Sequence, residues 1–265
     1  MNTLHLHHRA AHALCFTAVL LSVAVSGCRT HTSGPAADTS ARPSSEAVKS
    51  ASPALIEQGK RIFDQTPVYA AAYVGNKLAC SDCHIGSGTV DFAAPMLGLA
   101  GLFPMYSKRA GHVISLQNRI QECFARSEAG KPLPEESAEM HALVAYISSL
   151  SGDGEKGKPY KGRGLVKIPA LDGNPAAGKV VYAAQCAACH GKNGAGVPPV
   201  LPALWGKDSY NNGAGIDQPA KMAAYVLHNM PQAHPGILTP QQSYDVAAYI
   251  HTKPRPKFNE AYKSY

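Results

Sequence analysis

Two short motifs carry the residues with the clearest chemistry in this chain. Both read C-x-x-C-H, and their residues are Cys80, Cys83, His84, Cys186, Cys189 and His190. In this pattern the two cysteines form thioether bonds with haem, and the histidine ligates the iron. A zinc site or a thioredoxin-like pair could explain a lone C-x-x-C, but the histidine at the next position in both motifs favours haem. We therefore expect two covalently bound haem c groups.

Each haem iron needs a second axial ligand from elsewhere in the chain. For the second haem, the segment HNMPQAHPG offers Met230, a methionine followed by proline as is usual in cytochromes c. Met222 lies in the helical run KMAAYVLH and is expected in the core, whereas His228 and His234 are rival ligands. We predict that Met230 ligates the second iron.

For the first haem, spacing does not select a ligand. The side chains in range are Met96, Met105, Met140, His112, His141 and Cys123. Of seven cysteines, four belong to the haem motifs, and Cys15 and Cys28 lie in the N-terminal segment, so Cys123 has no partner for a disulfide. It is either a small buried core residue or a functional thiol.

The surroundings of Cys123 favour a functional thiol. The run LQNRIQECFARS predicts a helix in which Arg119, Cys123 and Ser127 share one stripe, at i, i+4 and i+8. Ile120 and Phe124 form an apolar stripe that would hold this helix against a core. A thiolate needs cations nearby, and Arg119 and the neighbouring Arg126 could supply them.

The sequence around the two motifs repeats. Gly-Lys-x-x-aromatic precedes each motif, beginning at Gly59 and at Gly178, and Ala-Tyr-Ile recurs in later amphipathic helices at 145–147 and 248–250. The predicted fold is therefore mainly α, with two tandem cytochrome c-type domains that each bind one haem c. The expected segments are a signal peptide (1–27), a flexible Ser/Thr/Pro/Ala stalk (28–52), a first domain (53–150), a linker (151–173) and a second domain (174–265).

The N-terminus has the features of an export signal. An apolar run from Ala13 to Val25 is too short to span a bilayer stably, and it ends in Val-Ser-Gly-Cys, which resembles the lipobox of bacterial lipoproteins. An ordinary cleavage site is the alternative. We expect a periplasmic protein that is tethered to a membrane through lipid at Cys28.

Composition limits the partners. The chain has 265 residues, 45% of them hydrophobic, and a net charge of +7, which is enough apolar content for packed cores and only a mild basic bias. Lys and Arg are scattered and do not cluster on one helix, so no nucleic-acid partner is expected. We expect instead that some of these positive side chains lie beside a binding site for a small anion.

The longer run GLFPMYSKRAGHVISLQNRIQECFARSEAGKPLP, followed by EMHALVAYISSLS and a second C-x-x-C-H domain, resembles the dihaem thiosulfate dehydrogenases. The resemblance covers about residues 53–258. It implies that Cys123 ligates the first iron and is catalytic, that Arg109, Arg119 and Ser127 surround the substrate, and that Met230 ligates the second iron. Some members have a lysine immediately before that methionine as an alternative ligand. This chain has Asn229 there, which puts ligand switching at the second haem in doubt.

The function that the resemblance implies is oxidation of two thiosulfate ions to tetrathionate, a reaction that could also run in reverse. Electrons would pass from the Cys-ligated haem to the His/Met haem and then to a soluble or membrane-bound acceptor cytochrome. Two alternatives remain: a dihaem electron carrier without chemistry of its own, and a Sox-type sulfur-oxidation cytochrome.

Overall fold

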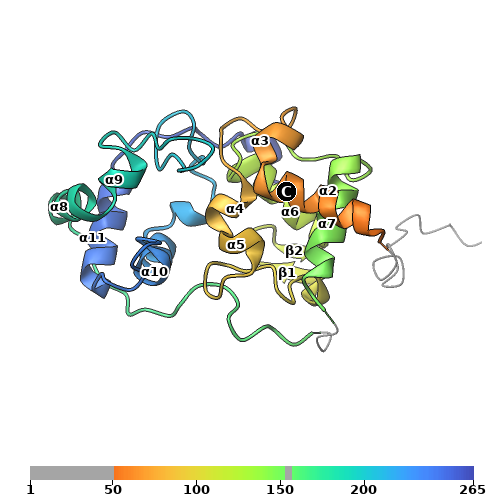
Figure 1. Cartoon of the computed structure of the whole chain (residues 1–265), viewed down its shortest axis with the longest axis horizontal. Helices are drawn as coiled ribbons and strands as arrows, with labels where there is room; N and C mark the ends of the chain where they lie inside the picture. Colours follow the sequence, from red (N-terminus) through yellow and green to blue (C-terminus); the bar gives the residue numbers. More distant parts are fainter. Residues whose placement is uncertain (1–50, 153–156) are drawn as a thin grey trace, which may run out of the picture. The chain divides into compact units, whose positions relative to one another are not determined.

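The computed structural model describes residues 51–152 and 157–265, and it places a pair of crossing helices in each half. In the first half, α2 (Pro53–Asp64) crosses α7 (Ala138–Ser149) (Figure 1). The approach is close because Gly59 has no side chain: a Cβ there would collide with the backbone oxygen of Ala142. In this way the repeated glycine allows the two helix backbones to touch.

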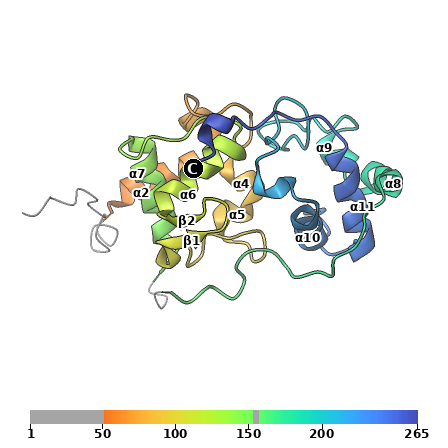
Figure 2. The ribbon, with the colours of Figure 1, turned by 180° about the vertical axis from the view of Figure 1, so that it is seen from behind.

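The second half repeats this crossing with α8 (Pro175–Gln185) and α11 (Pro240–His251) (Figure 2). A Cβ on Gly178 would collide with the backbone oxygen of Asp245. Thr239 caps the start of α11: its hydroxyl accepts a hydrogen bond from the N–H of Gln242 in a capping box. The same helix crossing at a glycine therefore occurs in both halves, as the predicted duplication requires.

Two further helices matter for function, α6 (Leu116–Arg126) and α10 (Pro219–Asn229). The other described elements are short: α3 (Thr66–Tyr69), α4 (Cys80–Cys83), α5 (Ile85–Gly88), η1 (Ala100–Leu102), β1 (Met105–Ser107), β2 (His112–Ile114), α9 (Ala187–His190), η2 (Gly215–Asp217) and η3 (Glu260–Tyr262). The mainly α prediction is confirmed.

Several predictions concern residues outside the described ranges. The predicted signal peptide (1–27), the predicted lipid site Cys28 and the stalk up to residue 50 lie there. In the part of the chain that the structure does describe, no helix is both long and apolar enough to cross a membrane. The described residues all belong to one compact unit, so the predicted boundaries between the two domains and their linker stay a prediction.

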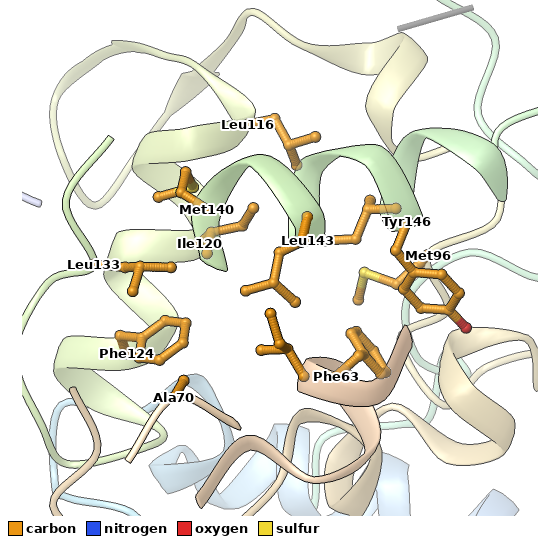
Figure 3. Close-up of a cluster of buried hydrophobic side chains, with 13 residues drawn as sticks. Phe63, Ala70, Met96, Leu116, Ile120, Phe124, Leu133, Met140, Leu143 and Tyr146 are labelled. Carbon is orange, nitrogen blue, oxygen red and sulfur yellow. The ribbon is translucent and has the colours of Figure 1, made fainter. Parts of the chain in front are cut away.

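Apolar side chains from α2, α6 and α7 meet in the first core (Figure 3). Phe63 comes from α2, Phe124 from α6 and Leu143 from α7, and all three are almost completely buried. A second core gathers Tyr182, Met222, Tyr244, Val246 and Ile250. Each half therefore has an apolar centre of its own against which its helices pack.

The two halves are joined by buried side-chain hydrogen bonds. Asn211, in the second half, donates from Nδ2 to the backbone oxygen of Ala125 at 2.8 Å, at the end of α6. Asn76 donates to the backbone oxygens of Ser127 and Ser209, at 2.8 and 3.1 Å. Because buried amides lose much when a partner is removed, these bonds hold α6 against the second half.

A two-stranded antiparallel hairpin, β1 with β2, precedes α6 and was not predicted. Its turn is closed by the Ser107 hydroxyl, which accepts a hydrogen bond from the N–H of Ala110, and by Gly111, whose φ of 76° suits glycine. Three-residue strands leave little periodicity in a sequence, so the pattern could not reveal them. The turn carries Lys108 and Arg109.

Candidate functional site

The first C-x-x-C-H motif forms α4 and the residue that follows it. The Thr66 hydroxyl accepts a hydrogen bond from the Cys80 N–H at 3.1 Å and lies 3.4 Å from the Cys80 sulfur, which fixes the start of the motif. The His84 ring donates from Nδ1 to the backbone oxygen of Ala94 at 2.7 Å. That bond leaves Nε2 as the free lone pair, which is the arrangement of a metal-binding histidine.

Burial also keeps this imidazole neutral. It lowers the pKa of His84 to about 4, although the hydrogen bond to Ala94 acts in the opposite direction. A neutral imidazole is the form that binds iron, because protonation would occupy the lone pair. The histidine is therefore ready for a metal at neutral pH.

His84 lines a cavity, which we call the thiol cavity. Its walls are mostly apolar, and they combine the first haem motif with one face of α6. The lining residues are Phe63, Leu78, Ala79, Cys80, Cys83, His84, Met96, Leu99, Leu116, Arg119, Ile120, Cys123, Phe124, Ser127, Glu128, Leu143 and Ile147. Two cysteines, a neutral histidine and apolar walls fit a haem c.

The predicted stripe of α6 faces this cavity. Arg119, Cys123 and Ser127 all line it, and the predicted apolar residues Ile120 and Phe124 are buried in the first core (Figure 3). Helix α6 begins at Ser115, where a capping box with Asn118 fixes the first turn. The helical periodicity was therefore predicted correctly, and it brings three of the predicted site residues together.

Among the candidate ligands for the first iron, Cys123 and Met96 line the thiol cavity. Met140 is completely buried in the core, and His112 and His141 are exposed. Met96 does line the cavity, but it packs against Gly88 just after the histidine, where a Cβ would lie 2.7 Å from the Met96 Cγ. Cys123 comes from α6, which forms a different wall of the cavity from the one that carries His84, so its thiol can approach a haem iron from the other side.

The Cys123 thiol lies between opposing electrostatic influences. Burial raises its pKa, Arg119 and, more weakly, Arg109 lower it, and Glu122 and Glu128 raise it further. The protein side chains alone therefore do not keep this thiol ionised at neutral pH. An iron ion would favour the thiolate, since metal ligation requires the deprotonated sulfur.

Arg119 is held by a buried carboxylate. Its guanidinium contacts Glu122 one turn along α6, and Glu122 is only 2% exposed. Cys123, in its ionised form, and this carboxylate raise the pKa of Arg119, although burial acts in the opposite direction. The pair fixes the direction in which Arg119 points. The sequence analysis did not identify Glu122, although its i, i+3 spacing from Arg119 on the predicted helix is the signal that could have found it.

Arg126 does not take the role that the sequence favoured for it. Its guanidinium lies 4.0 Å from the centre of the Phe258 ring and donates to the Tyr265 backbone oxygen at 3.2 Å. It is directed toward the C-terminal segment. Arg109, from the hairpin turn, is the second arginine with an electrostatic effect on the Cys123 thiol.

Arg109 and Arg119 meet in a second cavity of about 480 Å³, which we call the cationic cavity. It is lined by Ser107, Lys108, Arg109, Arg119, Glu122, Gly215, Gln218 and Lys221. Arg119 lines both cavities and so connects the anion-binding groups to the thiol. Lys221 was not predicted, because in the sequence it is one scattered lysine before a buried helix face.

Glu128 is a second buried carboxyl group that the sequence did not single out. It lines the thiol cavity, and burial, with a smaller effect of Asp82, raises its pKa well above the usual range. Its Oε2 atom has no hydrogen-bond partner among the described residues. Burial therefore favours the protonated form of this carboxyl group.

The second C-x-x-C-H motif is arranged like the first. His190 donates from Nδ1 to the backbone oxygen of Pro202 at 2.9 Å, and burial lowers its pKa. Trp205 packs 5.0 Å from the Tyr182 ring beside the motif. Cys186 lies in the same apolar cluster. These residues also fit a haem c, with a free Nε2 for iron.

Met230 follows the last residue of α10 and packs against the second core. Met222 is buried in that core, as expected. His228 is exposed, with its ring 5.1 Å from that of Phe92, and His234 is exposed as well. Among the predicted candidates, Met230 is thus the one that packs with the apolar cluster of Cys186.

The side chain of Asn229 makes two hydrogen bonds to backbone oxygens. Its Nδ2 donates to the backbone oxygen of Phe92, in the first half, at 3.1 Å and to that of Tyr225 at 3.0 Å. Both amide hydrogens therefore have acceptors, and an amide nitrogen has no lone pair suited to iron. This residue anchors the end of α10 against the first half.

Comparison with known proteins agrees with this arrangement. Residues 66–155 match a family model described as SoxA/TsdA, cytochrome c domain, and residues 175–253 match one described as cytochrome c. The chain therefore contains two cytochrome c domains, which confirms the predicted fold class and implies haem c.

Individual relatives cover most of the chain. A thiosulfate dehydrogenase of Stutzerimonas stutzeri is 39% identical over 209 residues, which is 77% of this chain and 68% of that protein. One of Allochromatium vinosum is 38% identical over 216 residues, 77% of this chain and 80% of that protein. Among solved structures, a thiosulfate dehydrogenase (TsdBA) of Marichromatium purpuratum has a TM-score of 0.71 at 33% identity over 76% of this chain. This chain spans 46% of that longer chain.

Proposed function

The chain belongs to the thiosulfate dehydrogenase family, and from this premise we propose that it oxidises two thiosulfate ions to one tetrathionate ion. The observation that carries the proposal is the thiol cavity, in which Cys123 and Arg119 share one space with the first haem motif. A plain electron carrier has no need of a thiol and a guanidinium beside its haem site.

Anion binding is the first task. Thiosulfate is a dianion, and two of them must approach one another against their repulsion. Arg109 and Arg119 can donate charge-assisted hydrogen bonds to the sulfonate oxygens, and the Ser127 hydroxyl can donate a further one. Glu122 holds Arg119 in place, so the cation is oriented before substrate arrives.

Bond formation is the task of Cys123. Its thiolate forms a sulfur–sulfur bond with the sulfane sulfur of the first thiosulfate, and two electrons leave the pair. The sulfane sulfur of the second thiosulfate then attacks the sulfane sulfur held on Cys123. The sulfur–sulfur bond of tetrathionate forms, the bond to Cys123 breaks and the thiolate is restored. Two thiosulfate ions thereby yield tetrathionate and two electrons.

The two cysteines of each motif would hold a haem c, with His84 and Cys123 as iron ligands in the first half and His190 and Met230 in the second, and each haem would supply a one-electron acceptor. The chain contributes the ligands and the apolar walls around them. We propose an acceptor cytochrome as the external partner, because electrons must leave the protein in every turnover.

Location is part of the proposal. The chain would be exported to the periplasm and tethered by lipid at Cys28, with residues 28–52 as a stalk between the membrane and the first domain (53–150). Cleavage and acylation can be checked by labelling cells with a radioactive fatty acid and comparing the wild type with Cys28→Ala. An unlabelled wild-type protein would refute the anchor without affecting the proposed chemistry.

The test of function is thiosulfate-dependent reduction of the haems in purified holoprotein, with tetrathionate measured as the product. We expect reduction and tetrathionate formation in the wild type and neither in Cys123→Ala. If purified protein is not reduced by thiosulfate but accepts electrons from a reduced cytochrome, the carrier alternative holds. A requirement for an additional carrier protein with a substrate cysteine would favour the Sox-type alternative.

A further inference from the structure

The proposed mechanism does not use the wall of the cationic cavity that carries Gln218 and Lys221. One side consists of the β1–β2 turn with Lys108 and Arg109, and a second side is the part of α6 that carries Arg119. The third side comes from the second half of the chain, where Gln218 and Lys221 begin α10. The cavity is therefore completed by a domain whose assigned role is electron transfer.

The two halves approach each other closely at this point. The Nη2 atom of Arg109 lies 3.9 Å from the position that a Cβ on Gly215 would occupy. Lys221 is close enough to the arginines that Arg109 and Arg119, together with the larger effect of burial, lower its pKa. The lysine thus faces the same space as the two arginines that belong to the first half.

Charge in this cavity is strongly unbalanced. Four cationic side chains line it, and Glu122 is the one carboxylate among its lining residues. Glu122 is already in contact with Arg119. Within residues 51–152 and 157–265, no carboxylate pairs with Lys108, Arg109 or Lys221. Uncompensated cations that face one another repel, so an anion between them would be stabilised.

The position of Lys221 on its helix adds to this preference. It is the third residue of α10, and the Gln218 side chain makes no capping hydrogen bond to the first turn. The positive end of the α10 dipole therefore lies at the start of the helix, where Lys221 is placed. Helix and side chain both favour negative charge at this place.

A reaction between two dianions needs more positive charge than one dianion requires. Arg119, near the thiol and partly neutralised by Glu122, suits the thiosulfate that reacts with Cys123. The second thiosulfate must wait within reach of that adduct, and the adduct itself keeps a sulfonate group. A separate group of cations next to Arg119 would hold it there against repulsion.

We propose that Lys221, together with Lys108 and Arg109, forms a binding site for the second sulfur oxyanion at the boundary between the two domains. This inference rests on the proposed thiosulfate oxidation for its substrate, but the site itself is defined by its charge and would take any small dianion with oxygen atoms. Lys221 is here a binding residue, and the second domain contributes it directly to the chemistry of the first.

The test compares three variants of the full-length holoprotein with the wild type. Lys221→Gln removes the charge, Lys221→Arg keeps it, and Lys179→Gln removes an exposed lysine on α8 that does not line the cavity. The KM for thiosulfate and kcat are measured by acceptor reduction. The dissociation constant of sulfate, an unreactive dianion, is measured by isothermal titration calorimetry.

We expect Lys221→Gln to raise both the KM for thiosulfate and the dissociation constant for sulfate by about fivefold to tenfold, with a smaller change in kcat. Lys221→Arg should bind both anions more tightly than Lys221→Gln, and Lys179→Gln should match the wild type. If thiosulfate is oxidised normally and Lys221→Gln leaves both constants unchanged, the second site is refuted.

A different result would separate the two proposals. If the wild type does not oxidise thiosulfate but binds sulfate in a manner that depends on Lys221, the proposed function fails and the anion site stands. Equal weakening by Lys221→Gln and Lys179→Gln would point to the overall charge of the protein and would also refute a specific site.

Discussion

The two halves of this protein contain the same order of structural elements, but they differ in the sulfur-containing residue that follows the haem motif: Cys123 in the first half and Met230 in the second. Each half has a helix that crosses a partner at a glycine, a C-x-x-C-H motif whose histidine donates to a backbone oxygen, and a later helix before the last one. In the first half that later helix, α6, carries Cys123 within its length. In the second half α10 ends at Asn229, and Met230 follows it.

The two sulfur atoms differ most in the side chains around them. Around Cys123 lie Arg119, Glu122 and a cavity that leads to further cations. Around Met230 lie apolar and aromatic side chains of the second core. A thiol beside an arginine suits a reaction with anions, whereas a thioether among apolar side chains suits electron transfer without bond formation.

The largest expected effect is loss of the thiol. Cys123→Ala should lower the turnover of thiosulfate by about a thousandfold or more, because the residue that bonds to the substrate is gone. Haem content, measured from the absorbance of the reduced protein, should stay normal because the four motif cysteines remain. Turnover at the wild-type rate in this variant would remove the functional contrast between the two halves.

The next effect in size concerns the cation beside the thiol. Arg119→Gln should lower kcat/KM for thiosulfate by about a hundredfold, since it removes a preoriented donor and leaves the buried Glu122 without its partner. Arg61→Gln, on the exposed side of α2, is the matched control and should change kcat/KM less than twofold. Similar losses in both variants would mean that general charge, and not this contact, attracts the substrate.

A third effect appears in the redox potentials. A thiolate-ligated iron should have a lower potential than a His/Met iron, so a redox titration should resolve two steps, the lower one assigned to the first haem. Met230→Leu should shift the higher step alone, and the core control Met222→Leu should shift neither. A Cys-ligated haem with the higher potential would reverse the proposed direction of electron flow.

The smallest effect concerns stability and tests the likeness of the two halves. Gly59→Ala and Gly178→Ala should each reduce the free energy of unfolding by about 1–3 kcal/mol, because the added Cβ collides with a backbone oxygen of the crossing helix. Gly101→Ala, where a Cβ meets open space, is the control. Thermal unfolding followed by circular dichroism measures all three. A neutral Gly178→Ala would show that the second crossing is looser than the first.

Much of this arrangement could be predicted from local sequence. The haem motifs are fixed by spacing, and the stripe of Arg119 and Cys123 follows from the period of a helix, which depends only on neighbouring residues. Met222 was correctly placed in the core on the same grounds. These features need no knowledge of what packs against what.

The remaining features depend on contacts between distant segments. Arg109 reaches the site because an unpredicted hairpin turns back beside α6, and Lys221 arrives from another domain. Asn211 and Asn229 join the halves through backbone oxygens, which every residue possesses and no motif marks. Side-chain types and periodicity carry no information about such pairings, so they become visible only in the folded chain.

The central claim, that sulfur chemistry takes place on Cys123 in the first half while Met230 in the second half serves electron transfer alone, is tested most directly by mass spectrometry of the intact holoprotein. The protein would be mixed with thiosulfate, supplied with an electron acceptor and quenched in acid during turnover. We predict one added thiosulfate group on the wild type, located on Cys123 by peptide mapping, and none on Cys123→Ala. An adduct on any other residue, or turnover of the wild type with no adduct at any quench time, would contradict the account.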